Sequence, residues 1–66
     1  MNPESEIHFW NMVAESWKEL SNWCDREIKK GNDIPWHTQK RRFISTQIES
    51  ANKQISFYTN QLKQIA

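Results

Sequence analysis

A single glycine divides this 66-residue chain into two long stretches that contain few residues able to end a helix. Gly31 is the only glycine, and the two prolines, Pro3 and Pro35, lie close to where each stretch begins. A multi-stranded sheet needs a turn between each pair of strands, and glycine and proline supply much of the chemistry of turns. The sequence therefore predicts an all-α fold with two long helices joined near the glycine.

The first stretch carries signals for both ends of a helix. At its start, Asn2 can cap the helix with its side chain, and Pro3 occupies a position where its missing N–H costs nothing. At its end, two lysines precede Gly31, which can enter a left-handed cap without steric cost. We predict a helix over about residues 3–30, followed by a turn over about residues 31–34.

Apolar residues in the first helix recur at alternating spacings of three and four, which is a heptad pattern of the coiled-coil kind. Three further apolar residues, Ile7, Phe9 and Trp23, widen the stripe on its flanks. We expect the core seam of this helix to consist of Trp10, Val13, Trp17, Leu20 and Cys24.

The second stretch repeats the pattern over three heptads. Its helix could begin at Pro35, with Asp33 as an approximate cap, or at Thr38 acting as its own cap, and both alternatives remain open. We predict a helix over about residues 35–65, antiparallel to the first because the connection is short. Its expected seam residues are Ile44, Ile48, Ala51, Ile55, Tyr58, Leu62 and Ile65.

A two-helix hairpin has one shared seam and cannot cover a stripe as wide as this. We treat residues 1–66 as a single domain, which at this length is marginally stable without help. Cys24 is the only cysteine, so a disulfide cannot supply that help. We therefore predict a homodimer that forms a four-helix bundle. It would cover the leftover aromatic residues, Phe9, Trp23, Phe43 and Phe57.

Charge is divided unevenly along the chain. Residues 1–27 contain six acidic and two basic residues, whereas residues 28–66 contain seven basic and two acidic residues. The two halves attract each other, as the halves of a folded-back hairpin would. Folding also gathers cations at the hairpin tip, where Lys40, Arg41 and Arg42 are poorly placed at the positive start of the second helix.

The tip is the best candidate for a contact with another macromolecule. Trp23 and Trp36 lie off the main seam, and tryptophan is over-represented among residues that anchor interfaces. We predict a small non-enzymatic regulator or adaptor that binds a protein. The alternative is a nucleic-acid-binding protein, in which Trp36 stacks on a base and the cations follow the phosphates. The predicted partner-binding residues are Trp23, Trp36, Lys29, Lys30, Lys40, Arg41 and Arg42.

Other classes of function lack support in the sequence. Cys24, His37 and Asp33 could be written as a nucleophile, a base and an orienting acid, but no glycine-containing loop near the thiol could form an oxyanion hole. We expect no catalytic residue, no cofactor, no metal site and no small-molecule substrate. No apolar run approaches membrane-spanning length, and the chain does not start like a signal peptide. We therefore expect a cytoplasmic protein with a reduced thiol and no membrane contact.

Overall fold

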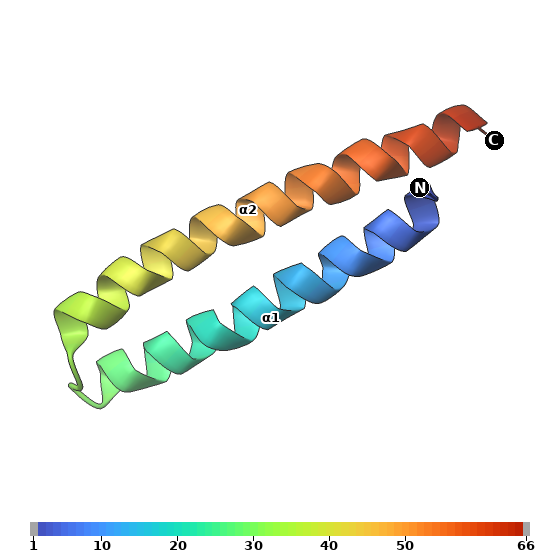
Figure 1. Ribbon diagram of the computed structural model, residues 1–66. Helices are drawn as coiled ribbons and strands as arrows, with labels where there is room; N and C mark the ends of the chain where they lie inside the picture. The colour runs from blue at the N-terminus through green and yellow to red at the C-terminus, as the bar shows by residue number, and fades with distance from the viewer. Residues whose placement is uncertain (1, 66) are drawn as a thin grey trace.

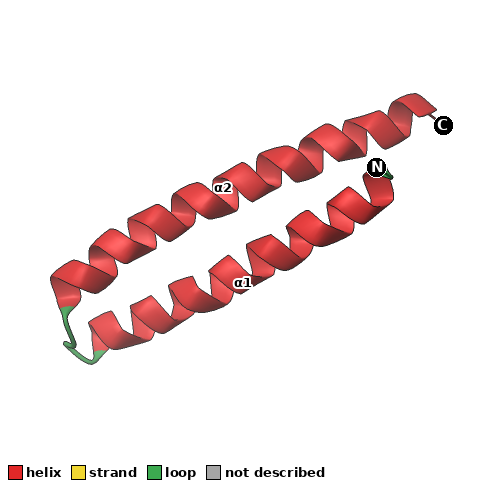
Figure 2. Ribbon diagram, viewed as in Figure 1, coloured by secondary structure: helices red, strands yellow, loops and turns green. Residues whose placement is uncertain are grey.

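The molecule is an antiparallel hairpin of two helices, α1 (Pro3–Lys29) and α2 (Ile34–Ile65), with the start of α1 and the end of α2 at the same end of the rod (Figure 1). Figure 2 shows the short connection between them. The structure, a computed structural model, describes residues 2–65 but not the side chain of Ile65, so the predicted seam position of Ile65 lies outside the described residues. The predicted all-α hairpin is confirmed. The helix bounds agree with the predicted ones to within one residue.

The ends of α1 form as their residues predict. The side-chain oxygen of Asn2 accepts a hydrogen bond of 2.9 Å from the backbone N–H of Glu4. At the other end, the N–H of Gly31 donates to the carbonyl of Ile28, and the N–H of Asn32 donates to the carbonyl of Glu27, both at 3.0 Å. These two bonds make a Schellman motif, which requires the positive φ of +80° that Gly31 adopts.

Helix α2 begins at Ile34, one residue before the first predicted alternative and four before the second. Asp33 has a φ of +44°, and its carbonyl accepts a hydrogen bond of 3.1 Å from the N–H of His37. This bond is the first of the helix, because it joins residues four apart. Asp33 therefore stands at the N-cap, and Thr38 lies within the helix.

The core between the helices is narrow and consists mostly of small side chains. Ile44 and Cys24 are completely covered, and Ala14 and Ala51 are 3% and 1% exposed. His37, at 5% exposed, is the only buried polar residue among those described. Small residues on both helices allow the backbones to approach closely, as in tight helix packing.

The seam of α1 differs from the predicted one at two positions. Leu20 is 37% exposed and Val13 is half-buried, whereas Ala14 is buried. Helix α1 is therefore rotated so that Ala14, rather than Val13, faces α2. The prediction of Leu20 as a core residue was wrong. The wide apolar stripe allowed more than one rotation, and the small side chain of Ala14 permits the closer approach.

The hairpin is longer than a compact domain of the same size. Its radius of gyration is 15.2 Å, whereas about 11 Å is expected for a compact chain of this length. Its accessible surface is 5060 Å², against about 4,450 Å² for a folded monomer of this mass. The isolated hairpin thus leaves an unusual share of its surface in water.

Candidate interaction surface

Six large apolar side chains form one exposed surface, which we call the aromatic face. They are between 37% and 55% exposed, although each belongs to a residue type that is normally well buried. Helix α1 contributes three of them and α2 the other three. The residues are Phe9, Leu20, Trp23, Trp36, Phe43 and Phe57.

Contacts between the helices show that these residues share one side of the hairpin. The ring of Trp23 meets that of Trp36 edge-on, with centroids 6.5 Å apart. Near the middle of the rod, Trp17 meets Phe43 in the same way at 5.9 Å. Both contacts cross from α1 to α2. Phe9 and Phe57 are two heptads from Trp23 and Phe43 along their own helices, which keeps them on the same stripe.

The aromatic face follows a second heptad pattern beside the core seam. Its positions on each helix are spaced alternately by four and three, as a seam that packs against another helix requires. Each helix therefore carries two parallel seams, one turned toward its hairpin neighbour and one toward solvent. The second seam is Phe9, Val13, Ser16, Leu20 and Trp23 on α1, and Trp36, Lys40, Phe43, Gln47, Ser50, Gln54 and Phe57 on α2.

Lys40 is the cation within the second seam of α2. Its Nζ lies 5.6 Å from the ring centroid of Trp36 and 5.5 Å from that of Phe43. Cation–π attraction holds the side chain over these rings and is worth about 0.5–1 kcal/mol at an exposed site. Lys40 is thus directed onto the aromatic face, away from the other tip cations.

The remaining predicted tip cations point in different directions. Arg41 forms an ion pair with Asp25 of α1 on the side of the hairpin opposite the aromatic face, and Lys30 pairs with Glu27 at 3.8 Å. Asp25 thus supplies a counter-ion for Arg41, which is poorly placed at the positive start of its own helix. Lys29 and Arg42 are exposed.

The predicted partner-binding tryptophans surround a buried histidine. The ring centroids of Trp23 and Trp36 each lie 4.8 Å from that of His37, and both rings meet it edge-on. The Nδ1 atom of His37 is buried without a hydrogen-bond partner among the described residues. The structure thus brings Trp23 and Trp36 together at the tip end of the aromatic face.

One carboxyl group at the tip has a displaced pKa. The side chain of Asn32 donates a hydrogen bond of 2.7 Å to Glu27, which is the main reason that the pKa of Glu27 lies below its usual value of 4.5. The nearby Lys30 acts in the same direction. This interaction ties the connecting turn to the end of α1.

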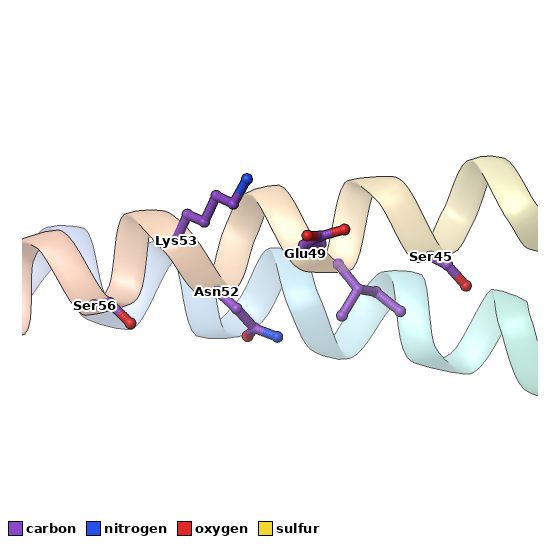
Figure 3. Close-up of a pocket in the computed structure, with 6 residues that line it drawn as sticks. Ser45, Glu49, Asn52, Lys53 and Ser56 are labelled. Carbon is purple, nitrogen blue, oxygen red and sulfur yellow. The ribbon is translucent and has the colours of Figure 1, made fainter.

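A shallow hollow lies on α2, away from the aromatic face (Figure 3). All its lining residues come from this one helix, so no second element walls it. It contains one carboxylate and one ammonium group, from Glu49 and Lys53, with no histidine or cysteine beside them. This composition gives no arrangement of nucleophile and base.

Neither a membrane span nor a metal-ligand cluster is found in the described part of the chain. No helix within residues 2–65 is both long and apolar enough to cross a membrane. Over the same residues, His, Cys, Asp and Glu nowhere gather in a group of three that could hold a metal ion. Cys24 is completely covered by its neighbours.

Comparison with known proteins does not identify a relative: no family model, curated protein or solved structure matches this chain.

The aromatic residues beside the core seam were predictable from the sequence, but their arrangement as a second heptad seam was not predicted. Trp36, Phe43 and Phe57 are separated by multiples of seven, and this spacing was a readable sign of a second seam on α2. The contact of Lys40 with these rings had a weaker signal, because it depends on the rotamer of a long side chain.

Proposed function

We propose that this chain is a small non-enzymatic regulator or adaptor that binds another protein as a helical-hairpin homodimer. In this dimer, the aromatic faces of two copies pack together into a four-helix bundle. The observation that carries the proposal is the aromatic face itself, with six large apolar side chains between 37% and 55% exposed. Soluble monomers rarely leave so much contiguous apolar surface in water.

The dimensions of the hairpin support a second copy as the occupant of this face. The molecule measures 50 × 15 × 14 Å, so the projected area of one long side is about 750 Å². A standard protein interface buries about 800 Å² on each partner. The second heptad seam on both helices also supports this occupant, because each helix of a four-helix bundle packs against two neighbours.

The hairpin tip supports the second part of the proposal, the contact with a protein partner. Residues 25–42 contain six basic and three acidic residues. Trp36 is 47% exposed there, with the exposed cations Lys29 and Arg42 on the adjoining turns. We propose that this combination binds an acidic protein surface, with tryptophan as the anchor and the cations guiding association.

The dimer is tested by measuring the molecular mass of the wild type and two variants by light scattering after size exclusion. The wild type is expected at about twice the 8.0 kDa of the chain. The change Phe43→Gln with Phe57→Gln should give a folded monomer. The control Ile34→Gln removes an exposed apolar side chain outside the face and should remain dimeric. A wild type that is monomeric at micromolar concentration would refute the proposal.

The partner contact is tested with two tagged baits in extract from the native host. The wild-type bait should retain a protein that is lost when Lys29, Arg42 and Trp36 are changed to Gln, Gln and Ala. If the retained material is instead a nucleic acid whose binding falls steeply with salt, the nucleic-acid alternative replaces the protein partner. Equal retention by both baits would remove the tip as the binding surface.

A further inference from the structure

We infer that the second copy on the aromatic face lies antiparallel to the first, with the two hairpin tips at opposite ends and the twofold axis midway between the levels of Ser16 and Ser50. This inference rests on the proposed homodimer and deepens it, because it fixes which residues meet. Two independent observations carry it: the order of residues along the second seams, and the position of Lys40.

The order of residues along the second seam of α1 is symmetric about its centre. Ser16 has a branched aliphatic residue on either side, Val13 and Leu20, and beyond them an aromatic residue on either side, Phe9 and Trp23. The aromatic positions are seven residues before and seven residues after the serine. A copy of this helix running in the opposite direction across the same centre therefore matches aromatic with aromatic and aliphatic with aliphatic.

The second seam of α2 has the same symmetry with the same offsets. Ser50 is flanked by Gln47 and Gln54, and then by Phe43 and Phe57, again seven residues away on either side. Two unrelated segments of the chain thus share one pattern with a small serine at its centre. A small residue near a twofold axis lets the two helices approach closely, because there a side chain faces its own copy.

The two centres lie close to each other along the rod. Three side-chain contacts that join the helices set their relative level, Asp25–Arg41, Trp17–Phe43 and Trp23–Trp36. The ion pair places Ser50 opposite Ser16, whereas the two ring contacts place it six to seven residues from that level, or about 10 Å at about 1.5 Å per residue. One axis perpendicular to the helices can therefore pass midway between the two centres, with each within about 5 Å of it.

This axis brings Phe9 near the partner's Trp23, and Phe43 near the partner's Phe57. In the aromatic face, such rings can pack edge-to-face, as Trp17 and Phe43 already do within one chain. Helix α1 lies over the partner's α1, and α2 over the partner's α2, so every neighbouring pair of helices is antiparallel.

Lys40 provides the second observation, because covering the aromatic face also covers its charge. Lys40 is ten residues before Ser50, and Glu6 is ten residues before Ser16. The perpendicular axis therefore brings Lys40 to the level of the partner's Glu6. Glu6 is half-buried beside the face, where it accepts a hydrogen bond of 3.2 Å from the indole N–H of Trp10. In the dimer, the ammonium group of each Lys40 then lies at the same level along the rod as the carboxylate of the partner's Glu6.

The competing arrangement lacks this compensation. A twofold axis along the rod would place both tips at one end, with Lys40 at the level of the partner's Lys40 and far from the partner's Glu6. Like charges that are brought together while losing water raise the free energy of association. The same arrangement would gather the exposed tip cations of both copies. Charge therefore favours the antiparallel dimer.

Cysteine cross-linking tests the axis directly. Ser16→Cys is introduced in a Cys24→Ala background, and the dimer is mildly oxidised. In the antiparallel dimer, the introduced thiols of the two copies lie on either side of the axis and can reach each other, so most of the protein should become a covalent dimer with unchanged helicity. The control Ser56→Cys lies on the hollow of α2 away from the face and should give at least about tenfold less product, since its copies do not meet.

A mixing experiment distinguishes the two orientations. In the competing arrangement, Ser16 lies over the partner's Ser50, so chains carrying Ser16→Cys and Ser50→Cys would cross-link to each other and not to themselves. That result, in a protein with the mass of a dimer, would overturn the antiparallel inference and leave the proposed homodimer standing. A monomeric wild type would overturn both.

A charge exchange tests the contact of Lys40 with Glu6. Lys40→Glu and Glu6→Lys should each raise the dimer dissociation constant by about tenfold, since each change creates two repulsive contacts in the symmetric dimer. The double variant should recover most of that loss. If the double variant dimerises no better than the weaker single variant, the two residues do not meet and the antiparallel register is refuted.

Discussion

Ile44 provides the sharpest test of the core, because it is the largest completely buried side chain described in the hairpin. Changing it to alanine removes about three methylene-sized groups, which corresponds to about 2.4 kcal/mol of transfer free energy. The space left behind adds about 1–2 kcal/mol if the two helices cannot close over it. We therefore expect the free energy of unfolding to fall by about 3–4 kcal/mol. A domain of this length has about 3–10 kcal/mol in total.

The matched control is the same change at Ile34, which is 46% exposed. There only about half of the transfer term is lost and no cavity forms, so the expected cost is about 1 kcal/mol or less. Urea unfolding followed by circular dichroism at 222 nm measures both variants, at one protein concentration because association would shift the midpoint. If Ile44→Ala is too unstable to fold, Ile44→Val should still cost about 0.5–1.5 kcal/mol. Equal losses at positions 44 and 34 would refute this packing of the two helices.

Three further predictions concern the turn and the ion pair near it. Asn32→Ala should lower the free energy of unfolding more at about pH 7 than at about pH 3, because the Asn32 hydrogen bond lowers the pKa of Glu27 in the folded state. A lowered folded-state pKa stabilises the fold at pH values above the unfolded pKa of 4.5, and this stabilisation is lost as the pH falls through the folded pKa. Gly31→Ala should lower the melting temperature by about 4–8 °C, since a left-handed alanine costs about 1 kcal/mol although no atom lies within 4 Å of the added methyl group; Gly31→Asn should lose less. A double-mutant cycle with Asp25→Asn and Arg41→Gln should give a coupling energy of about 0.2–1 kcal/mol that decreases with salt, because both side chains are nearly half exposed.

Local signals were sufficient to predict the helices and the turn. The cap at Asn2 and the left-handed Gly31 depend on bonds within a few residues, and both form as expected. The seam of α2 was also predictable, since Ile44 and Ala51 are buried where the heptad pattern places them. These two positions are seven residues apart on the predicted seam.

The rotation of α1 was harder to predict because its large residues and its buried positions do not coincide. Large side chains such as Leu20 dominate a hydrophobic pattern, whereas close packing selected Ala14. Two stripes one residue apart both satisfy the three-four spacing, and only the packing against α2 decides between them. The ion pair of Arg41 with Asp25 follows from that rotation, so a pattern within one helix could not reveal it.

The distribution of side-chain size between the two seams is the reverse of what a self-sufficient hairpin needs. The shared seam buries small or polar residues such as Ala14, Cys24 and His37, which contribute little transfer free energy. The large rings of Phe9, Phe57 and their neighbours remain about half exposed. Most of the apolar surface that could stabilise this chain is therefore available only when the aromatic face is covered. Folding and association of the proposed dimer would then draw on the same residues, so a substitution in the aromatic face would weaken both together.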